Sequence, residues 1–143
     1  MKQVIATLLA LLLAACGADP GTANAPSLLD LRGRFVVINY WAQWCKPCIE
    51  EIPELNELDA AHDNVSVLGV NFDGATGPEL AQQEERLGVA FPTLATDPFA
   101  ELGIARPVVL PTTMIVDPQG EVFSTLIGPQ TLESLEAAIA AYQ

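Results

Sequence analysis

Phe35-Val36-Val37-Ile38-Asn39-Tyr40-Trp41-Ala42-Gln43-Trp44-Cys45-Lys46-Pro47-Cys48 is the stretch that decides the fold. Its first seven residues form a continuous apolar run with β-branched and aromatic side chains, which is typical of a central strand buried on both faces. A helical pattern follows, with an apolar stripe at Ile49, Ile52, Leu55 and Leu58. We therefore predict that the two cysteines lie at the first turn of this helix, with their Cβ atoms on one face roughly 5–6 Å apart.

The segments after this unit alternate between strand and helix signals. A second buried strand after the first helix predicts a right-handed βαβ unit, and the turn signal Asp117-Pro118-Gln119-Gly120 predicts an antiparallel hairpin. The closing helix has Thr131 as its expected N-cap. This order predicts an α/β fold with a mixed central sheet flanked by helices. The expected elements are strands at 65–72, 112–116 and 121–127, helices at 78–87 and 132–142, an extended piece at 91–95 and one helical turn at 98–104.

Length and charge narrow the classes of function. The chain has 143 residues, half of them hydrophobic, which suits one domain with a real core. Lys and Arg total 6 against 18 Asp and Glu, so the surface is acidic and repels phosphate backbones. Nucleic acid is therefore excluded as an expected partner.

The N-terminus has the pattern of a secretion signal over residues 1–15, with Lys2 followed by an apolar stretch too short for a membrane span of about 20 residues. Leu13-Ala14-Ala15-Cys16 resembles the lipobox of bacterial lipoproteins, which predicts lipidation at Cys16 and a lipid anchor in a membrane, either inner or outer. An ordinary cleavable signal with Cys16 as an incidental thiol is the alternative. Residues 16–27 are small, polar and proline-containing, which indicates a flexible tether, and the folded domain is expected at 28–143.

The cysteine pair favours thiol–disulfide exchange. A cysteine at a helix N-terminus is stabilised as the thiolate by free N–H groups and the helix dipole, which makes Cys45 the attacking thiol. Cys48, one turn further in and more buried, is then the resolving thiol. An inert structural disulfide is the alternative, but so short a loop restrains the unfolded chain little.

We expect no metal and no other cofactor. A zinc site needs four ligands, and beyond the pair the chain offers only Cys16 and His62. A copper carrier that pairs two cysteines with a histidine would again have only His62, which we expect to be exposed at the outer end of the helix.

Two further positions are candidates. Glu51 lies three residues after Cys48 and could relay a proton to or from that thiol, although a solvated helix residue fits the spacing equally well. Pro111 stands just before a strand, where a cis peptide bond would turn the chain sharply beside the active site. The residues alone do not raise it above the other prolines of the chain.

Residues 32–55 and 111–122 resemble the thioredoxin-like oxidoreductases of the TlpA/ResA type, which include the cytochrome c maturation thioredoxins. The resemblance covers about residues 28–142. It implies a thioredoxin-like fold with an extra strand–helix element at 65–88, a cis Leu110–Pro111 bond and the Cys-x-x-Cys-x-x-Glu pattern. In that pattern Cys45 is the nucleophile, Cys48 the resolver and Glu51 an acid.

The resemblance also places the residue before the cis-proline against an extended substrate, so we expect substrate contacts at Trp44, Leu110 and Pro111. Two positions depart from the family. Asn39 stands where general thioredoxins carry a buried acid, so Glu51 would take the proton work. Lys46 replaces the acidic or neutral residue common between the cysteines.

These features together predict a membrane-tethered disulfide reductase in the periplasm or on the extracytoplasmic face of a membrane. It would pass electrons to cysteine-containing protein substrates and be re-reduced by a membrane electron donor, because the compartment is oxidising. A disulfide-forming oxidant of the same fold and a non-catalytic binding module or holdase remain as alternatives, and a peroxidase is a weaker one.

Overall fold

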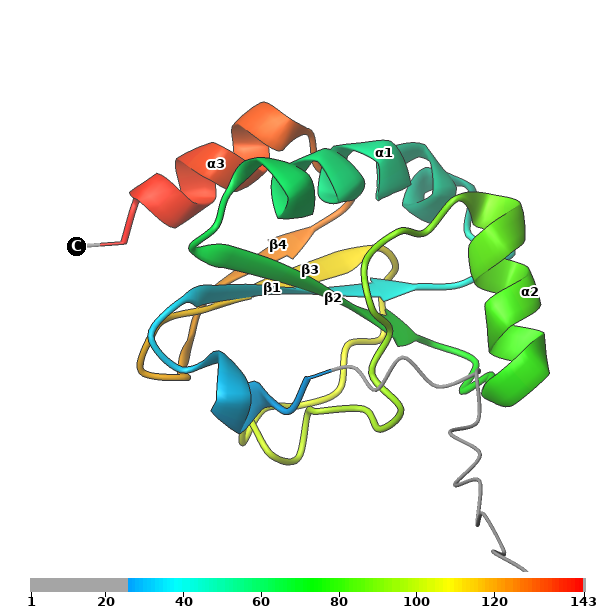
Figure 1. The fold of residues 1–143 in the computed structure, drawn as a ribbon, viewed down its shortest axis with the longest axis horizontal. Coiled ribbons are helices and arrows are strands. Elements are labelled where there is room, and N and C mark those ends of the chain that lie inside the picture. Colours follow the sequence, from blue (N-terminus) through cyan, green and yellow to red (C-terminus); the bar gives the residue numbers. More distant parts are fainter. Residues whose placement is uncertain (1–25, 143) are drawn as a thin grey trace, which may run out of the picture.

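The computed structural model describes residues 26–142, which form a mixed sheet of strand order β2-β1-β3-β4 with helices packed on it (Figure 1). The predicted signal peptide, Cys16 and all of the predicted tether before Pro26 lie outside these residues. No helix within residues 26–142 is long and apolar enough to cross a membrane. The elements are η1 (Leu28–Leu31, a 3-10 helix), β1 (Phe35–Trp41), α1 (Lys46–Ala61), β2 (Val65–Asn71), α2 (Gly77–Leu87), β3 (Thr112–Val116), β4 (Val122–Ile127) and α3 (Leu132–Ala140).

Strand β1 lies in the middle of the sheet. It pairs in parallel with β2 over its full length, from Phe35 opposite Val65 to Trp41 opposite Asn71, and antiparallel with β3. Strands β3 and β4 form the predicted antiparallel hairpin. The expected mixed sheet is therefore confirmed. The strand–helix segment at 65–88 is present as β2 and α2, and β2 is a full member of the sheet.

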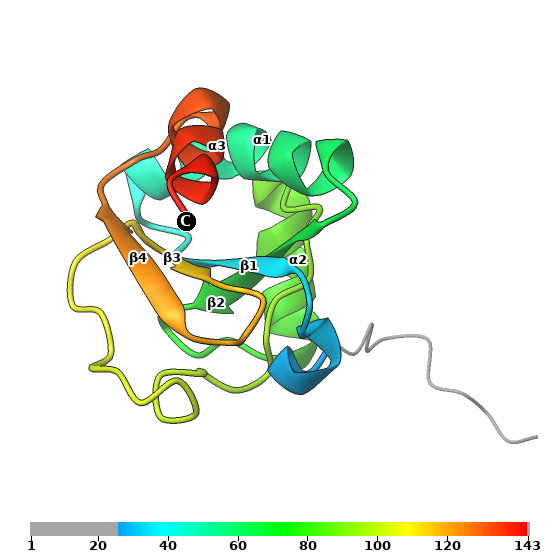
Figure 2. The ribbon, with the colours of Figure 1, turned by 90° about the vertical axis from the view of Figure 1, so that its left-hand side faces the viewer.

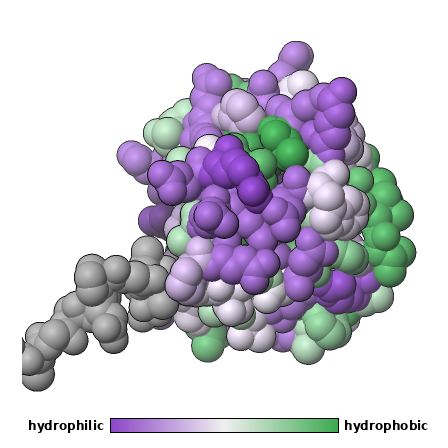
Figure 3. All heavy atoms as spheres, turned by 90° about the vertical axis from the view of Figure 1, so that its right-hand side faces the viewer, coloured by the Kyte–Doolittle hydropathy of each residue, from purple (hydrophilic) through white to green (hydrophobic). Residues whose placement is uncertain are grey.

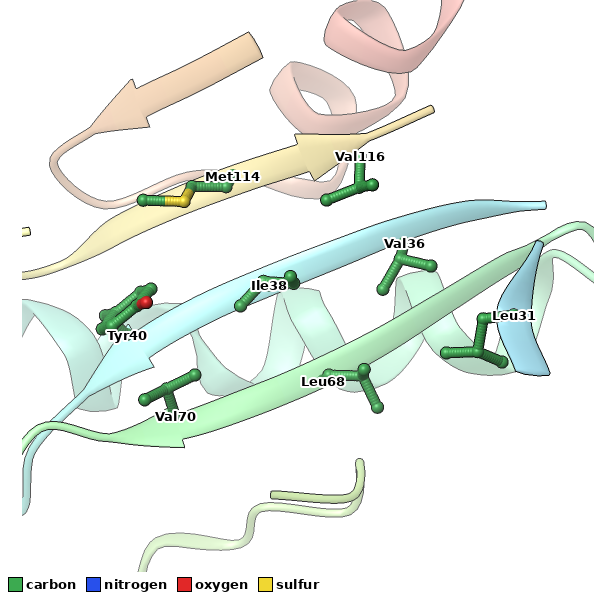
Figure 4. Packing of buried hydrophobic residues seen from close by; sticks show 8 residues of the cluster. All are labelled: Leu31, Val36, Ile38, Tyr40, Leu68, Val70, Met114 and Val116. Atoms are coloured by element: carbon green, nitrogen blue, oxygen red, sulfur yellow. The ribbon is translucent and has the colours of Figure 1, made fainter. Parts of the chain in front are cut away.

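The alternation of side chains along β1 divides the core into two layers. Helices α1 and α3 lie together on one face, as Figure 2 shows, and Val37 packs there with the apolar stripe of α1. The opposite face carries the next cluster, which η1 and the chain between α2 and β3 cover (Figures 1 and 4). That cluster comprises Leu31, Val36, Ile38, Tyr40, Leu68, Val70, Met114 and Val116. Because both faces are covered, β1 is buried on both sides, as its apolar run predicts.

A polar network fixes the segment that leads into β3. The Arg106 Nε donates to Asp97 Oδ2 at 2.7 Å, and the Tyr40 hydroxyl donates to Asp97 Oδ1 at 2.6 Å. A second Arg106 nitrogen donates to the Phe72 carbonyl at 2.8 Å, with the guanidinium 4.2 Å from the centre of the Phe72 ring. Burial and the neighbouring Asp97 raise the pKa of Tyr40, so its hydroxyl keeps the proton that it donates. The segment that contains Asp97 and Arg106 is thereby attached to the central strand β1.

Helix α3 begins with a capping box at the predicted N-cap. Thr131 Oγ1 accepts from the Ser134 N–H at 3.2 Å, and Ser134 Oγ accepts from the Thr131 N–H at 2.9 Å. We expect Thr131→Ala to lower the free energy of unfolding by about 1 kcal/mol, measured by urea denaturation. Thr131→Ser keeps the hydroxyl and should recover most of that loss. Equal stabilities of the two variants would contradict a role for the cap.

Candidate active site

The two cysteines are joined in a disulfide at the start of α1. The Cys45 N–H donates to the Ala42 carbonyl at 3.1 Å, which closes a tight turn after β1. Cys45 is the N-cap of α1, and its sulfur accepts from the Cys48 N–H at 3.3 Å. The two Cα atoms are 5.3 Å apart. The predicted placement of both thiols at the first helical turn is therefore confirmed.

Cys45 is the more accessible of the two cysteines, although both are well enclosed. It keeps 4% of its surface exposed, whereas Cys48 keeps none. They form a cluster with the buried Trp41 and Ala42, and half-buried apolar side chains pack against it, Leu110 among them. Of the two cysteines, only Cys45 therefore keeps any accessible surface.

Trp44 and Lys46 flank Cys45 on the surface. Trp44 is 63% exposed, and its indole Nε1 donates to Asp73 Oδ2 at 2.9 Å, which fixes the ring beside the disulfide. The Lys46 ammonium lies 3.7 Å from the Glu50 carboxylate, and both side chains are exposed, so this ion pair contributes little to stability.

The Leu110–Pro111 peptide bond is cis, as the family resemblance implies. Pro111 is buried, and Leu110 packs against the cluster that holds the cysteines. Val108 and Val109, which precede it directly, are 88% and 49% exposed. The loop therefore places Leu110 beside the disulfide. Val108 and Val109 of this loop also contribute to an open cleft of about 220 Å³, lined by Ile104, Ala105, Pro107, Val108, Val109, Thr112, Met114, Thr125 and Ile127.

Glu51 lies on the side of α1 that faces the sheet and is buried there, with only 1% of its surface exposed. One carboxylate oxygen accepts from the Asn39 side-chain amide at 2.6 Å, and the other accepts from the Gln130 backbone N–H at 2.8 Å. The Asn39 amide also donates to Thr113 Oγ1 at 3.0 Å. The alternative of a solvated helix residue is therefore wrong.

Burial dominates the protonation of this carboxyl. It raises the pKa of Glu51 from 4.5 to about 7, against the opposing effect of the hydrogen bonds from Gln130 and Asn39. A carboxyl with this pKa takes up and releases a proton near neutral pH, as general acid–base catalysis requires.

Sequence reasoning missed the residues that hold Glu51. In the sequence Asn39 stands out only as a departure from general thioredoxins, although an amide inside an apolar strand is itself a signal that a buried polar partner lies nearby. Thr113 lies two residues after Pro111 and gave no separate signal. Gln130 contributes through its backbone N–H, which no side-chain pattern can reveal.

The cysteines and the histidine are far apart. His62 is the C-cap of α1, and its Nε2 lies 2.8 Å from the Glu136 carboxylate. A helix of 16 residues separates it from Cys45, which corresponds to roughly 24 Å. Cys45, Cys48 and His62 therefore do not form a metal shell. Within residues 26–142, no three His, Cys, Asp or Glu side chains are grouped so that they could hold a metal ion.

Comparisons with known proteins agree with this geometry. The model of the AhpC/TSA family matches residues 16–124. The thiol-disulfide oxidoreductase ResA of Geobacillus kaustophilus is 36% identical over 113 residues, which are 76% of this chain and 63% of that protein. The chain thus spans somewhat less than two thirds of this curated relative, and the TlpA/ResA-type resemblance is confirmed.

Two solved structures share the fold. A DsbF homologue from Corynebacterium diphtheriae is 27% identical with a TM-score of 0.68, covering 81% of this chain and 76% of that one. StoA from Bacillus subtilis is 26% identical with a TM-score of 0.59, covering 74% of this chain and 82% of that one. The chain therefore has a thioredoxin-like fold and belongs to the AhpC/TSA family.

Proposed function

We propose that this chain is a thiol–disulfide oxidoreductase that reduces disulfides in protein substrates through Cys45 and Cys48. The observation that carries the proposal is the Cys45–Cys48 disulfide at the N-terminus of α1, with Cys45 slightly accessible, Cys48 fully buried and a buried carboxyl on the same helix. Similarity to a protein named as a thiol-disulfide oxidoreductase supports it.

The exchange proceeds in two balanced steps. In the reduced protein, the Cys45 thiolate attacks one sulfur of a substrate disulfide, so that a mixed disulfide forms and the first substrate thiolate leaves. The Cys48 thiolate then attacks the Cys45 sulfur, which re-forms the Cys45–Cys48 disulfide and releases the second substrate thiolate. Two electrons pass to the substrate, and a reduced dithiol on another protein restores the pair by the reverse exchange.

Glu51 supplies the proton step in this scheme. Cys48 must lose its proton before it can attack, and Glu51 follows it by three residues on the same helix, where side chains are neighbours. The raised pKa of Glu51, about 7, suits a group that accepts this proton as the carboxylate and returns it as the acid.

Trp44, Leu110 and Pro111 form the substrate-contacting surface in this proposal. Trp44, which directly precedes Cys45, is exposed, and Leu110 packs against the cluster that contains Cys45. Figure 3 shows one end of the molecule, where hydrophilic side chains predominate and hydrophobic ones gather near the upper centre and along the right-hand margin. We expect an extended substrate segment with apolar side chains to contact Trp44, Leu110 and Pro111, as the family resemblance implies.

The location and partners follow from the same proposal. Residues 1–15 act as a signal peptide, Cys16 carries the lipid anchor, residues 16–27 form the tether, and residues 28–143 form the working domain on the extracytoplasmic, periplasmic side. A membrane electron donor keeps the pair reduced there. Apocytochromes c are one class of cysteine-containing client that the relation to cytochrome c maturation thioredoxins suggests.

Trapping of the mixed disulfide tests this proposal. In Cys48→Ser, the resolving thiol is absent, so Cys45 should remain bonded to its client. We expect non-reducing electrophoresis of an extracytoplasmic extract to show adducts that a reductant removes. The double variant Cys45→Ser/Cys48→Ser is the control and should form none. If Cys48→Ser forms no adduct either, the exchange function is refuted.

Two alternatives have distinct outcomes. A reduction potential of the Cys45/Cys48 pair well above that of a reductase would indicate disulfide formation instead. The direction of exchange is sensitive to this potential, because about 30 mV corresponds to roughly 1.4 kcal/mol for two electrons. Consumption of hydrogen peroxide by the reduced protein would favour a peroxidase. In the described part of the chain, the hydrogen bond to the Cys45 sulfur comes from the Cys48 N–H, with no Thr or Arg donor to it.

A further inference from the structure

Asn39 is a polar residue in the buried central strand β1. It is fully buried, between Ile38 and Tyr40, and its neighbours across the sheet are Gly69 on β2 and Thr113 on β3. A buried amide costs free energy unless it is hydrogen-bonded. Asn39 is therefore expected to form a hydrogen bond that an aliphatic side chain at this position could not form.

The Asn39 side-chain amide donates hydrogen bonds to two neighbours. Its Nδ2 donates to Glu51 Oε1 at 2.6 Å and to Thr113 Oγ1 at 3.0 Å. Its carbonyl oxygen Oδ1 is buried and has no hydrogen-bond partner. In this orientation the amide presents only donors to Glu51, which matches the acceptor-only carboxylate.

The unpartnered Oδ1 suits the other protonation state of Glu51. A half-turn of the amide about its last side-chain bond exchanges Nδ2 and Oδ1, so that Oδ1 faces the carboxyl and accepts from its O–H. The Thr113 hydroxyl can rotate to donate where it previously accepted. Asn39 can therefore donate to the carboxylate and accept from the O–H of the acid, neither of which a leucine could do.

We propose that Asn39 is a positioning residue for Glu51, which holds the carboxyl beneath the cysteine pair and lets it exchange a proton with Cys48. The proposal rests on the proposed function of Glu51 in the exchange reaction. Asn39 touches neither sulfur nor substrate in this scheme, and it acts only through Glu51.

The surroundings of Glu51 contain few competing groups. On its own helix, the exposed Glu50 directly precedes Glu51 and pairs with Lys46, Cys48 lies one turn earlier, and Glu54 lies one turn later, where its carboxylate accepts from an N–H at the start of α3. From β1, β3 and the loop before α3, the contacts come from Asn39 and, through it, Thr113, and from the Gln130 N–H. These contacts are uncharged, and only that from Asn39 comes directly from a side chain. A substitution at Asn39 can therefore change the proton affinity of Glu51.

The first test follows the Glu51 carboxyl directly in the oxidised protein, where the cysteines do not titrate. Glutamate is labelled with ¹³C at the side-chain carboxyl, and the Glu51 signal is assigned by its absence in Glu51→Gln. Asn39→Leu removes a hydrogen bond to a charged group, so the titration midpoint should rise by about one to two pH units. Asn39→Asp should replace the single step by two steps, because two adjacent carboxyls share one proton.

A matched control separates this effect from general damage to the fold. Asn71 is a buried asparagine on the neighbouring strand, whose amide donates to Gln83 Oε1 at 2.9 Å. Asn71→Leu should leave the Glu51 midpoint unchanged. An unchanged midpoint in Asn39→Leu, or a single unshifted step in Asn39→Asp, would overturn the proposal, and the two variants together keep it testable if one does not fold.

The second test measures the proton step by kinetics. The reduced protein is mixed with Ellman's disulfide in a stopped-flow instrument, and release of the second thionitrobenzoate reports attack by Cys48. We expect the pH at which this phase is half-maximal to rise in Asn39→Leu by as much as the titration midpoint rises. If the midpoint moves but the phase does not, proton exchange with Cys48 is refuted. Failure of the exchange function itself would appear separately, as loss of both phases in the native chain.

Discussion

Cys45→Ser is expected to abolish disulfide reduction, lowering the rate by more than about a thousandfold. The attacking atom must be an anion at neutral pH, and a serine hydroxyl does not ionise there. Cys48 cannot take its place, because it is fully buried beneath Cys45. The rate is measured with the reduced protein and a model disulfide under a dithiol reductant.

Cys48→Ser provides the comparison for this variant. It keeps the exposed thiol, so it should complete the first attack and then stop at the mixed disulfide, with one thiol released per chain and no turnover. Substantial turnover in Cys45→Ser would show that the chemistry lies elsewhere in the molecule. A normal rate in Cys48→Ser would show that resolution comes from an external thiol.

The stability of the oxidised protein should fall by about 3 kcal/mol as the pH rises from about 4.5 to about 7, through Glu51 alone. The pKa of Glu51 is about 7 in the folded chain and 4.5 as its ordinary value, so in this window the folded state binds one more proton than the unfolded state. Its contribution is complete below the lower value and is lost as the pH passes the higher one. Urea unfolding at a series of pH values measures this change.

Glu51→Gln isolates this contribution from the other carboxyls. The neutral amide cannot titrate, and after a half-turn of Asn39 its N–H group can donate to the free Asn39 Oδ1. The difference in free energy of unfolding between the native chain and Glu51→Gln should therefore change with pH by about 3 kcal/mol. Glu57→Gln, on the exposed side of the same helix, is the matched control. A constant difference for Glu51→Gln would contradict a raised pKa.

The central unit of the fold was predictable because its signals are local. The apolar run of β1 and the stripe on α1 are periodic patterns, and the bounds Phe35–Trp41 were predicted without error. The position of the cysteines at the helix start follows from the same patterns. Thr131 was predicted as an N-cap for the same reason, since capping involves residues close in sequence.

The environment of Glu51 was not predictable in this way. Its spacing from Cys48 suggested a role but equally a solvated position, because a single helix has no signal for what lies against it. The contacts that bury it come from Asn39, 12 residues earlier, and from Gln130, 79 residues later. Such contacts depend on the sheet order and on the packing of the loop before α3. Tertiary structure therefore had to supply the raised pKa.

The enclosure of Cys45 has a consequence for the choice of client. If disulfide exchange takes place at Cys45, as proposed, its 4% exposure and the packing of Leu110 against its cluster would favour a flexible polypeptide segment over a disulfide held in a rigid domain. Disulfides in incompletely folded or unfolded proteins would then be reduced, while those in folded proteins would remain intact. On the proposed function, the site would therefore select its substrates by how far they have folded.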